Sequence, residues 1–142
     1  MTDEAFEILS EVGRAADEAA PSGSSWIWED RFQAALLVLE CSEVAPFFDL
    51  VGSHCDENWS SSDVAVCSPD VGALVTEMAG LRAGQQLLVR KLDSRSFAYF
   101  TSWPWGDNEH VSIRFGVFYP AGELTDYAVS NIAIRRGLGV ES

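Results

Sequence analysis

Apolar residues recur at steps of three and four between residues 3 and 19, and acidic residues occupy the other positions of the helical wheel. This periodicity predicts an amphipathic helix over residues 3–19. Thr2 precedes it and can accept a hydrogen bond from a free N–H group of the first turn. Residues 21–25 then combine Pro, Gly and Ser, which favours a short loop.

Two further helices follow from the same kind of pattern. Ser68 and Pro69 form a favoured helix start, and the apolar stripe behind them is expected to end at Gly84. A last helix is predicted over about residues 123–136. Its two final arginines and the following Gly137 suit the C-terminal end of a helix.

Three strands are predicted in the second half of the chain, over residues 86–92, 96–102 and 110–119. The second and third are rich in β-branched and aromatic residues, and the first contains Leu and Val. Residues 93–95 are short enough for a hairpin loop between the first two, and residues 104–108 contain the Pro, Gly and Asn of a turn. Consecutive hairpins of this kind predict antiparallel pairing.

The middle of the chain is more ambiguous. The apolar run 32–39 fits a buried strand or a buried helix, and a strand is preferred because a central strand needs no polar face. Residues 42–52 then predict a helix that starts at Ser42 and ends at Gly52. Residues 56–63 are polar and predict a loop, and residues 64–67 predict a short strand.

This order of elements predicts one α+β domain over residues 1–142. Its sheet should be mainly antiparallel, with about four or five strands packed against three or four helices, because hairpins are consecutive and helices lie outside them. A chain of 142 residues is long enough to bury a core of its own.

Charge is distributed very unevenly along the chain. Residues 1–63 hold fourteen acidic and two basic residues, which leaves residues 64–142 nearly neutral in a protein of net charge −13. Clustered negative charge attracts cationic molecules and speeds their encounter, so we expect a basic protein partner. The same charge disfavours nucleic acids and anionic membrane surfaces, which are themselves negative. A salt-adapted source is a second explanation for the acids.

The remaining composition bears on the source and compartment. Lys91 is the only lysine beside eight arginines, and Ala, Gly and Ser are abundant, a bias typical of GC-rich bacterial genomes. The first residues lack the pattern of a signal peptide, and no apolar run is long enough to span a bilayer. Cys41, Cys55 and Cys67 are an odd number without paired spacing. We therefore expect free, buried thiols in a cytoplasmic protein.

Reactive side chains are densest around Cys55, which stands beside His54, Asp56 and Glu57. A thiol nucleophile needs a base, and His110 could supply one if folding brings it to Cys55. The alternative is a polar loop after a helix. No cysteine pair has zinc-knuckle spacing and no phosphate-binding loop or hydrolase motif occurs, so neither a metal nor a cofactor is predicted.

Two pairs of tryptophans stand at i and i+2, Trp26 with Trp28 and Trp103 with Trp105. In an extended backbone both members of a pair lie on one face. Such a pair could anchor a protein interface or stack on a ligand, and the alternative is core packing at the rim of the sheet. The acids expected to help bind a basic partner are Glu29, Asp30, Asp56 and Glu57.

Arg114 alternates with apolar neighbours on a predicted strand, so its side chain should face away from the core. Arg90 and Arg95 could lie on the same surface of the sheet. All three could pair with acids of the first half of the chain or bind an anion, and surface pairing is the commoner outcome.

Two functions of different classes are consistent with these features. The leading hypothesis is a small acidic binding protein for a basic protein partner, without catalysis. Immunity proteins against cationic toxins and acidic secretion chaperones illustrate the class by charge and size alone. The alternative is a small-molecule-binding or thiol-dependent enzyme domain, with a pocket between sheet and helices lined by Trp103, Trp105, Phe115 or Tyr119. A homo-oligomer with its aromatic residues in the interface is compatible with both.

Overall fold

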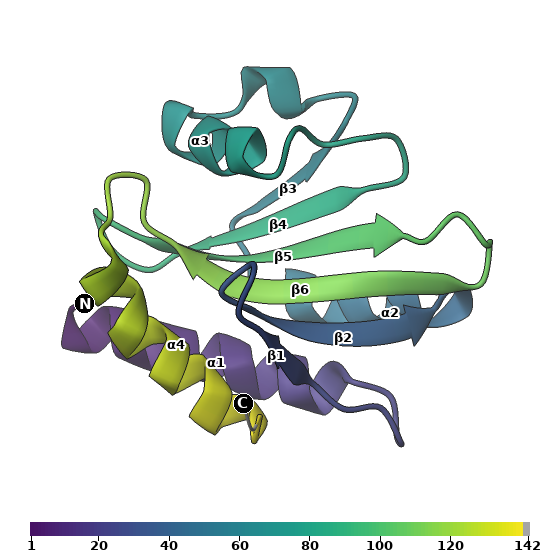
Figure 1. Ribbon diagram of the computed structural model, residues 1–142, viewed down its shortest axis with the longest axis horizontal. Coiled ribbons are helices and arrows are strands. Elements are labelled where there is room, and N and C mark those ends of the chain that lie inside the picture. The colour runs from purple at the N-terminus through teal and green to yellow at the C-terminus, as the bar shows by residue number, and fades with distance from the viewer. Residues whose placement is uncertain (141–142) are drawn as a thin grey trace.

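The structure is a computed structural model that describes residues 1–140, and it contains four α-helices, one short 3-10 helix and six strands (Figure 1). In chain order the elements are α1 (Asp3–Ala19), β1 (Ile27–Glu29), β2 (Ala34–Glu40), α2 (Cys41–Gly52), β3 (Glu57–Ser60), the 3-10 helix (Val64–Val66), α3 (Pro69–Glu77), β4 (Gln86–Lys91), β5 (Phe97–Pro104), β6 (His110–Phe118) and α4 (Leu124–Leu138). Over these 140 residues, no helix combines the length and apolar character that crossing a bilayer requires.

The six strands form one sheet in the order β1-β2-β6-β5-β4-β3, and every neighbouring pair is antiparallel. The predicted α+β class is therefore confirmed, but the sheet has six strands and not four or five. The three long hairpin strands β4, β5 and β6 were predicted almost to the residue. The additional strands are β1 and β3, two short strands at the edges of the sheet.

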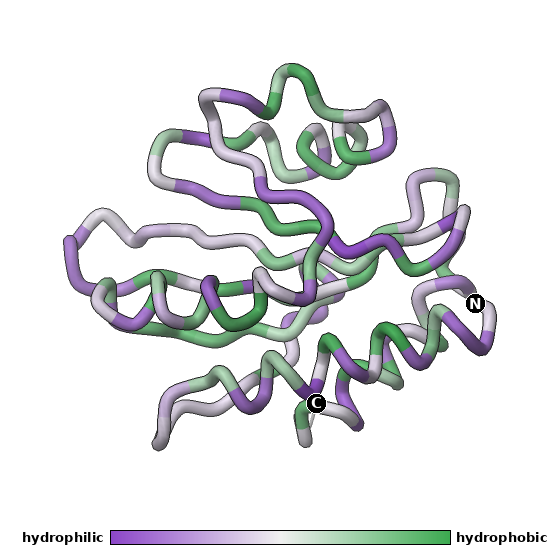
Figure 2. The backbone as a smooth tube through the Cα atoms, turned by 180° about the vertical axis from the view of Figure 1, so that it is seen from behind, coloured by the Kyte–Doolittle hydropathy of each residue, from purple (hydrophilic) through white to green (hydrophobic). Residues whose placement is uncertain are grey.

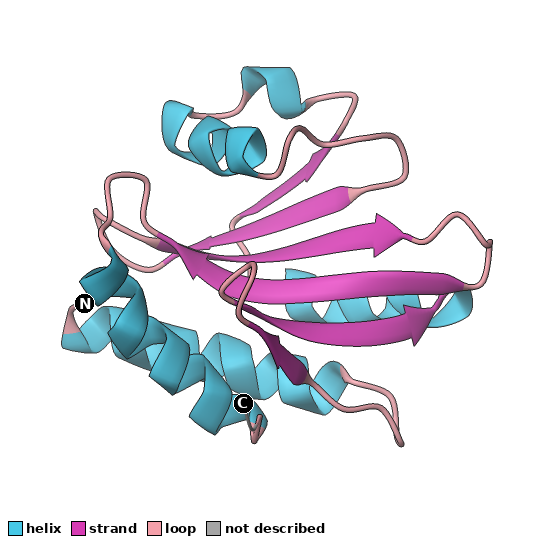
Figure 3. Cartoon of the chain, viewed as in Figure 1, coloured by secondary structure: helices cyan, strands magenta, loops and turns pink. Residues whose placement is uncertain are grey.

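Helices cover the two faces of this sheet very unequally (Figure 3). Helices α1, α2 and α4 pack on one side, which we call the helical face. Its core includes Phe100 and Phe115, whose rings stack at a centroid distance of 4.5 Å and are fully buried. The opposite side, the open face, is covered only near β4 by α3, through Val71 and Leu74. The rest of the open face carries no helix among the described residues.

The segment between α2 and α3 differs from its prediction. The polar residues Glu57–Ser60 form β3 and not a loop, because an edge strand pairs on one side only and can be polar. Trp59 packs towards α3, and Asp63 accepts the backbone N–H of Ser60 just where the strand ends. Val64–Val66, predicted as a strand, form a single turn of 3-10 helix with no strand to pair with.

The run 32–39 is a strand, as preferred, although β2 begins only at Ala34 because Gln33 adopts a positive φ of 51°. Helix α2 starts one residue earlier than predicted. Its N-terminus is capped by Glu40 and Glu43, each of which binds the other's backbone N–H, and not by Ser42.

Helices α1, α3 and α4 begin where the sequence predicts, and Thr2 and Ser68 cap α1 and α3. Helix α3 ends at Glu77, well before Gly84. Ala79 and Gly80 both have positive φ and turn the chain away from the helix. Helix α4 continues past the arginines to Leu138, and Gly139 is its left-handed cap.

A candidate binding groove on the open face of the sheet

The open face contains a groove of about 1000 Å³. Its floor is formed by side chains of β5 and β6, one wall by α3, and the other wall by the turn between β1 and β2. We call this cavity the groove. Its lining includes Glu29, Phe32, Met78, Tyr99, Trp103, Trp105, Ser112, Arg114 and Phe118.

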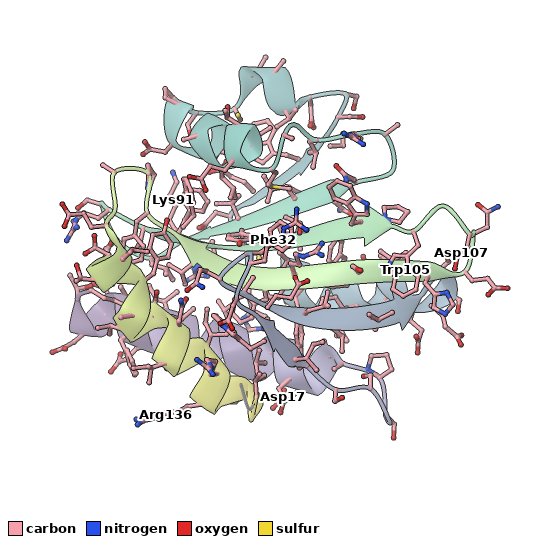
Figure 4. All side chains as sticks on the ribbon, in the orientation of Figure 1. Asp17, Phe32, Lys91, Trp105, Asp107 and Arg136 are labelled. Carbon is pink, nitrogen blue, oxygen red and sulfur yellow. The ribbon has the colours of Figure 1, made fainter. Side chains whose placement is uncertain are left out.

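The groove is long and runs with the strands. Ser112 and Phe118 both line it and lie six residues apart on β6. At about 3.4 Å per residue they are separated by roughly 20 Å. The groove therefore extends from the start of α4 to the β5–β6 hairpin, where Trp105 and Asp107 are located (Figure 4).

Large apolar side chains are exposed on this face. Five of them lie on β1, β2, β5 and the adjoining turns, with exposed fractions between 37% and 53%: Ile27, Phe32, Val38, Trp103 and Trp105. Val38, Ser112 and Trp103 are neighbours in one row across three strands. Contiguous apolar surface of this kind marks interaction sites more often than isolated exposed residues do.

Trp105 is held in a fixed orientation at the hairpin end of the groove. Its indole Nε1 donates a 2.7 Å hydrogen bond to Ser112 Oγ, and its ring lies 4.8 Å from the ring of His110. Its backbone N–H also donates to the carbonyl of His110. Trp103 lies two residues earlier on the same face, near the guanidinium of Arg82. Both members of the second tryptophan pair therefore lie in the groove.

An ion pair lies in the middle of the groove. Arg114 Nε donates to Glu29 Oε1 at 2.6 Å and Nη2 donates to Oε2 at 3.4 Å. The ring of Phe32 covers the guanidinium at 4.6 Å, and Phe32 lies in front of the middle of the sheet in Figure 4. Arg114 thus faces away from the core and pairs with an acid of the first half, as predicted.

Arg90 and Arg95, the other two arginines considered, do not pair with acids of the first half of the chain. Arg90 lies on the helical face and donates to the backbone carbonyl of His54 at 2.9 Å. Arg95 pairs with Asp126 at 3.2 Å, an acid of the second half of the chain. The expectation that all three arginines share one surface and pair with first-half acids is therefore wrong for Arg90 and Arg95.

Tyr99 places a hydroxyl group in the groove floor. Its side chain lies across Gly116, where a Cβ atom would come within 2.7 Å of the hydroxyl oxygen. Burial, with negative charge at Glu77 and Glu29, raises the pKa of Tyr99, so the phenol is neutral and can donate. The residue is only 8% exposed.

The β5–β6 hairpin carries a compact group of titratable side chains. One oxygen of Asp107 accepts the backbone N–H groups of Glu109 and His110 at 2.9 Å, and the other lies 2.7 Å from His110 Nδ1. These bonds hold the pKa of Asp107 far below its usual range, and the Asp107 carboxylate raises the pKa of His110. Both oxygens of Asp107 are already engaged, so this group is a turn stabilised by its own side chains.

Cys55 is separated from His110 by the whole of α2. His110 pairs with Glu40, immediately before α2, while Cys55 comes three residues after the end of this twelve-residue helix. Twelve helical residues span about 18 Å. Burial and the neighbouring Asp56 raise the pKa of the Cys55 thiol to about 12, and the thiol donates weakly to the carbonyl of Val51. The structure thus does not bring the two candidates together.

The three thiols are free, as expected, but Cys41 is exposed and the other two are only partly buried. The expectation of buried thiols is therefore wrong for Cys41. This residue lies at the first position of α2, where the backbone N–H donates to Glu109 and the side chain faces outward.

The first tryptophan pair is placed against the core. Trp26 is 7% exposed and packs between Phe47 and Phe115 on the helical face. Trp28 is half-buried, donates to Asp30 at 3.1 Å and has the guanidinium of Arg135 over its ring. The first tryptophan pair therefore packs against the core and is not an exposed contact surface.

The predicted acidic contacts are dispersed. Glu29 lines the groove and Asp30 lies just outside it. Asp56 and Glu57 lie at the far edge of the sheet, beside a smaller cavity of about 290 Å³. There Asp56 accepts the backbone N–H of Lys91, and Glu57 accepts the indole N–H of Trp59. The structure therefore does not gather these four residues into one site.

Sequence reasoning missed Phe32, Tyr99 and Met78 as groove residues. Phe32 stands at the start of an apolar run and resembles a core residue. Tyr99 could have been found, because it alternates with Phe100 on β5 and so shares a face with Trp103. The position of Met78 depends on where α3 ends, which the sequence pattern did not indicate.

Most of the acids lie on the helical side of the molecule. Hydrophilic and hydrophobic residues alternate along the helix that starts at the N-terminus (Figure 2), and all six acids of α1 are exposed. Of the fourteen acids in residues 1–63, only Glu29 and Glu57 form salt bridges within the described part of the chain. The negative charge of the first half is thus largely unneutralised.

Comparisons of this chain with protein-family models, with curated proteins and with solved structures found no match. What the protein does is therefore inferred from its own residues.

Proposed function

We propose that this protein binds another protein by holding an extended segment of it in the groove on the open face. The observation that carries the proposal is the group of five large apolar side chains exposed on a sheet face, around a groove floored by β5 and β6. Exposed tryptophans near the centre of a surface are typical anchors of protein interfaces. Trp103 and Trp105 would occupy that role.

The shape of the groove favours a polypeptide over a small ligand. Pockets for small molecules enclose most of their ligand, whereas Trp103 and Trp105 remain 37% and 53% exposed. A length of roughly 20 Å matches about six residues of extended chain. The Tyr99 phenol, which lines the groove, could donate to a carbonyl oxygen of such a segment.

The charge of the molecule supports a partner that is basic overall. A net charge of −13, mostly on exposed and unpaired acids, would steer a cationic protein towards this one over a distance set by the ionic strength. We propose this role for a cytoplasmic protein, because three free thiols are stable under reducing conditions. Steering brings the partner near, and the groove then holds it.

The thiol-dependent alternative has less support. The nucleophile of a cysteine enzyme is a thiolate, and a pKa of about 12 keeps Cys55 protonated at neutral pH. His110, the base predicted for this thiol, does not reach it, because His110 lies beyond the other end of α2.

A random twelve-residue peptide library displayed on phage tests the proposal. The wild-type protein should select peptides that bind in the micromolar range, and the double variant Trp103→Ala/Trp105→Ala should bind the same peptides at least tenfold more weakly. Truncating interface tryptophans commonly costs 2 kcal/mol or more, a factor of about thirty. Titration calorimetry on the selected peptides measures the difference.

Phe6→Ala is the matched control, because Phe6 is 44% exposed but lies on α1, away from the groove. It should leave peptide binding unchanged. The proposal is wrong if selection gives no specific peptide, or if the control and the double variant weaken binding equally. It is also wrong if the wild-type protein is a dimer that the double variant dissociates, because the groove would then hold a second copy.

A further inference from the structure

The two ends of the groove differ in charge. At the hairpin end, two exposed acidic residues, Asp107 and Glu109, lie in the turn that follows Trp105. At the other end the groove is lined by Phe118, Leu124 and Tyr127. One end is therefore acidic and the other apolar.

The middle of the groove has no excess of negative charge. Arg31 and Arg114 both line it, with guanidinium carbons 5.1 and 4.6 Å from the ring centre of Phe32. Two carboxylates, Glu29 and Glu77, line it as well, and Glu29 pairs with Arg114. A positively charged side chain would meet balanced charge here, whereas at the hairpin end it would lie beside carboxylates.

Trp105 offers that cation a second interaction. A lysine or arginine over an indole ring is attracted by the negative face of the ring, and Trp is the best aromatic residue for this contact. One edge of Trp105 is fixed by Ser112 and the ring is supported by His110, yet the residue is 53% exposed. The ring is thus presented to solvent in an orientation that binding need not rearrange.

A separate observation indicates that the groove takes a ligand with polar groups. Tyr99 is 8% exposed and lines the groove with its phenol, a group that can donate a hydrogen bond to a ligand. It lies about four residues from Trp103 along β5, close enough for one extended segment to contact both.

From this charge pattern we infer that the groove binds its segment in one direction, with a lysine or arginine side chain of the segment placed between Trp105 and the carboxylates of Asp107 and Glu109. Apolar side chains of the same segment lie along the floor towards α4. The inference rests on the proposed function, because it names the partner residue that the hairpin end of the groove selects.

The peptides selected from the random library test it. They should contain a lysine or arginine at a fixed distance from apolar residues. The variant Asp107→Asn/Glu109→Gln should bind them about tenfold more weakly at low salt, because it removes two charges and keeps the side-chain sizes. Replacing the selected arginine by citrulline, which has the same shape without the charge, should weaken binding to the wild-type protein by a similar factor.

Glu7→Gln/Glu11→Gln is the control, since it makes the same change of charge on the exposed side of α1. Binding to it should fall by less than about twofold, the effect of net charge alone. Peptides that depend on Trp103 and Trp105 but lack a common basic residue would overturn this inference and leave the proposed function intact. Equal losses in the two charge variants would overturn it as well. Peptides that do not depend on the tryptophans would contradict the proposed function itself.

Discussion

The two faces of the sheet are built from the same strands but are used differently. On β5, Ala98 and Phe100 point to the helical face and are fully buried beneath helices. Their neighbours Thr101 and Trp103 point to the open face, where the groove lies. Helices that cover one face supply the core, and the incomplete cover of the other leaves apolar surface for a partner. Stability and binding should therefore respond to mutations on different faces.

The largest expected effect is the loss of stability when the helical face is truncated. Phe100→Ala removes a fully buried ring stacked on Phe115 and should lower the free energy of unfolding by about 3–5 kcal/mol. Trp103→Ala, three residues further along β5 and on the open face, should lower it by less than about 1 kcal/mol. Urea denaturation followed by circular dichroism measures both. Similar losses would mean that the open face belongs to the core.

A smaller effect should arise at the floor of the groove. Gly116→Ala places a Cβ atom 2.7 Å from the Tyr99 hydroxyl, so the ring must move, at an expected cost of about 1–3 kcal/mol of unfolding free energy. In a Tyr99→Ala background the same change should cost almost nothing, since the obstructing ring is gone. A double-mutant cycle by urea denaturation gives the coupling. Absence of coupling would show that Tyr99 does not lie across Gly116.

The ion pair across the groove should contribute less. Arg114 and Glu29 side chains are 20% and 23% exposed, so their interaction lies between that of a surface pair and a buried pair. A double-mutant cycle of Arg114→Met and Glu29→Gln, measured by urea denaturation, should give a coupling free energy of about 1 kcal/mol. The pair Lys91 and Glu57, which lies at 3.9 Å and whose lysine side chain is 74% exposed, should give nearly none. A larger coupling for Lys91 and Glu57 than for Arg114 and Glu29 would contradict the distances and exposures of the two pairs.

The smallest effect is a pH dependence at the hairpin. The pKa of His110 is raised by Asp107, so its contribution to stability is complete below its unfolded pKa and is lost as pH rises through the folded pKa. The pKa of Asp107 is lowered, so its contribution is present above its unfolded pKa and is lost as pH falls through the folded pKa. Proton NMR should show His110 titrating above its ordinary pKa, and Asp107→Asn should remove the shift. An unshifted His110 in the wild-type protein would mean that the contact is not formed.

The fold class and most elements were predictable because they depend on local signals. Helix caps at Thr2 and Ser68 and the alternation of strands β4 to β6 indicate their elements directly. β3 was not predictable, because its polar residues are determined by pairing with β4 and by its place at the edge of the sheet. A pattern of hydrophobicity does not reveal which polar segment has a partner.

The candidate site was predictable only in part. The spacing of Trp103 and Trp105 indicated one shared face, and Arg114 was expected to face outward. Trp26 and Trp28 have the same spacing but pack against the core. The sequence does not distinguish the two pairs, because both show two tryptophans at i and i+2. The difference arises from which face the helices cover, and α3 is too short to cover the whole open face. That is a property of the tertiary structure.

The central claim is that the open face binds the partner and the helical face does not. The indole N–H signals of the five tryptophans in a proton–nitrogen NMR spectrum test this directly, because both faces are represented among them. On addition of a selected peptide, the signals of Trp103 and Trp105 should shift and that of Trp26 should stay in place. A shift of Trp26 with Trp103 and Trp105 unchanged would contradict the account.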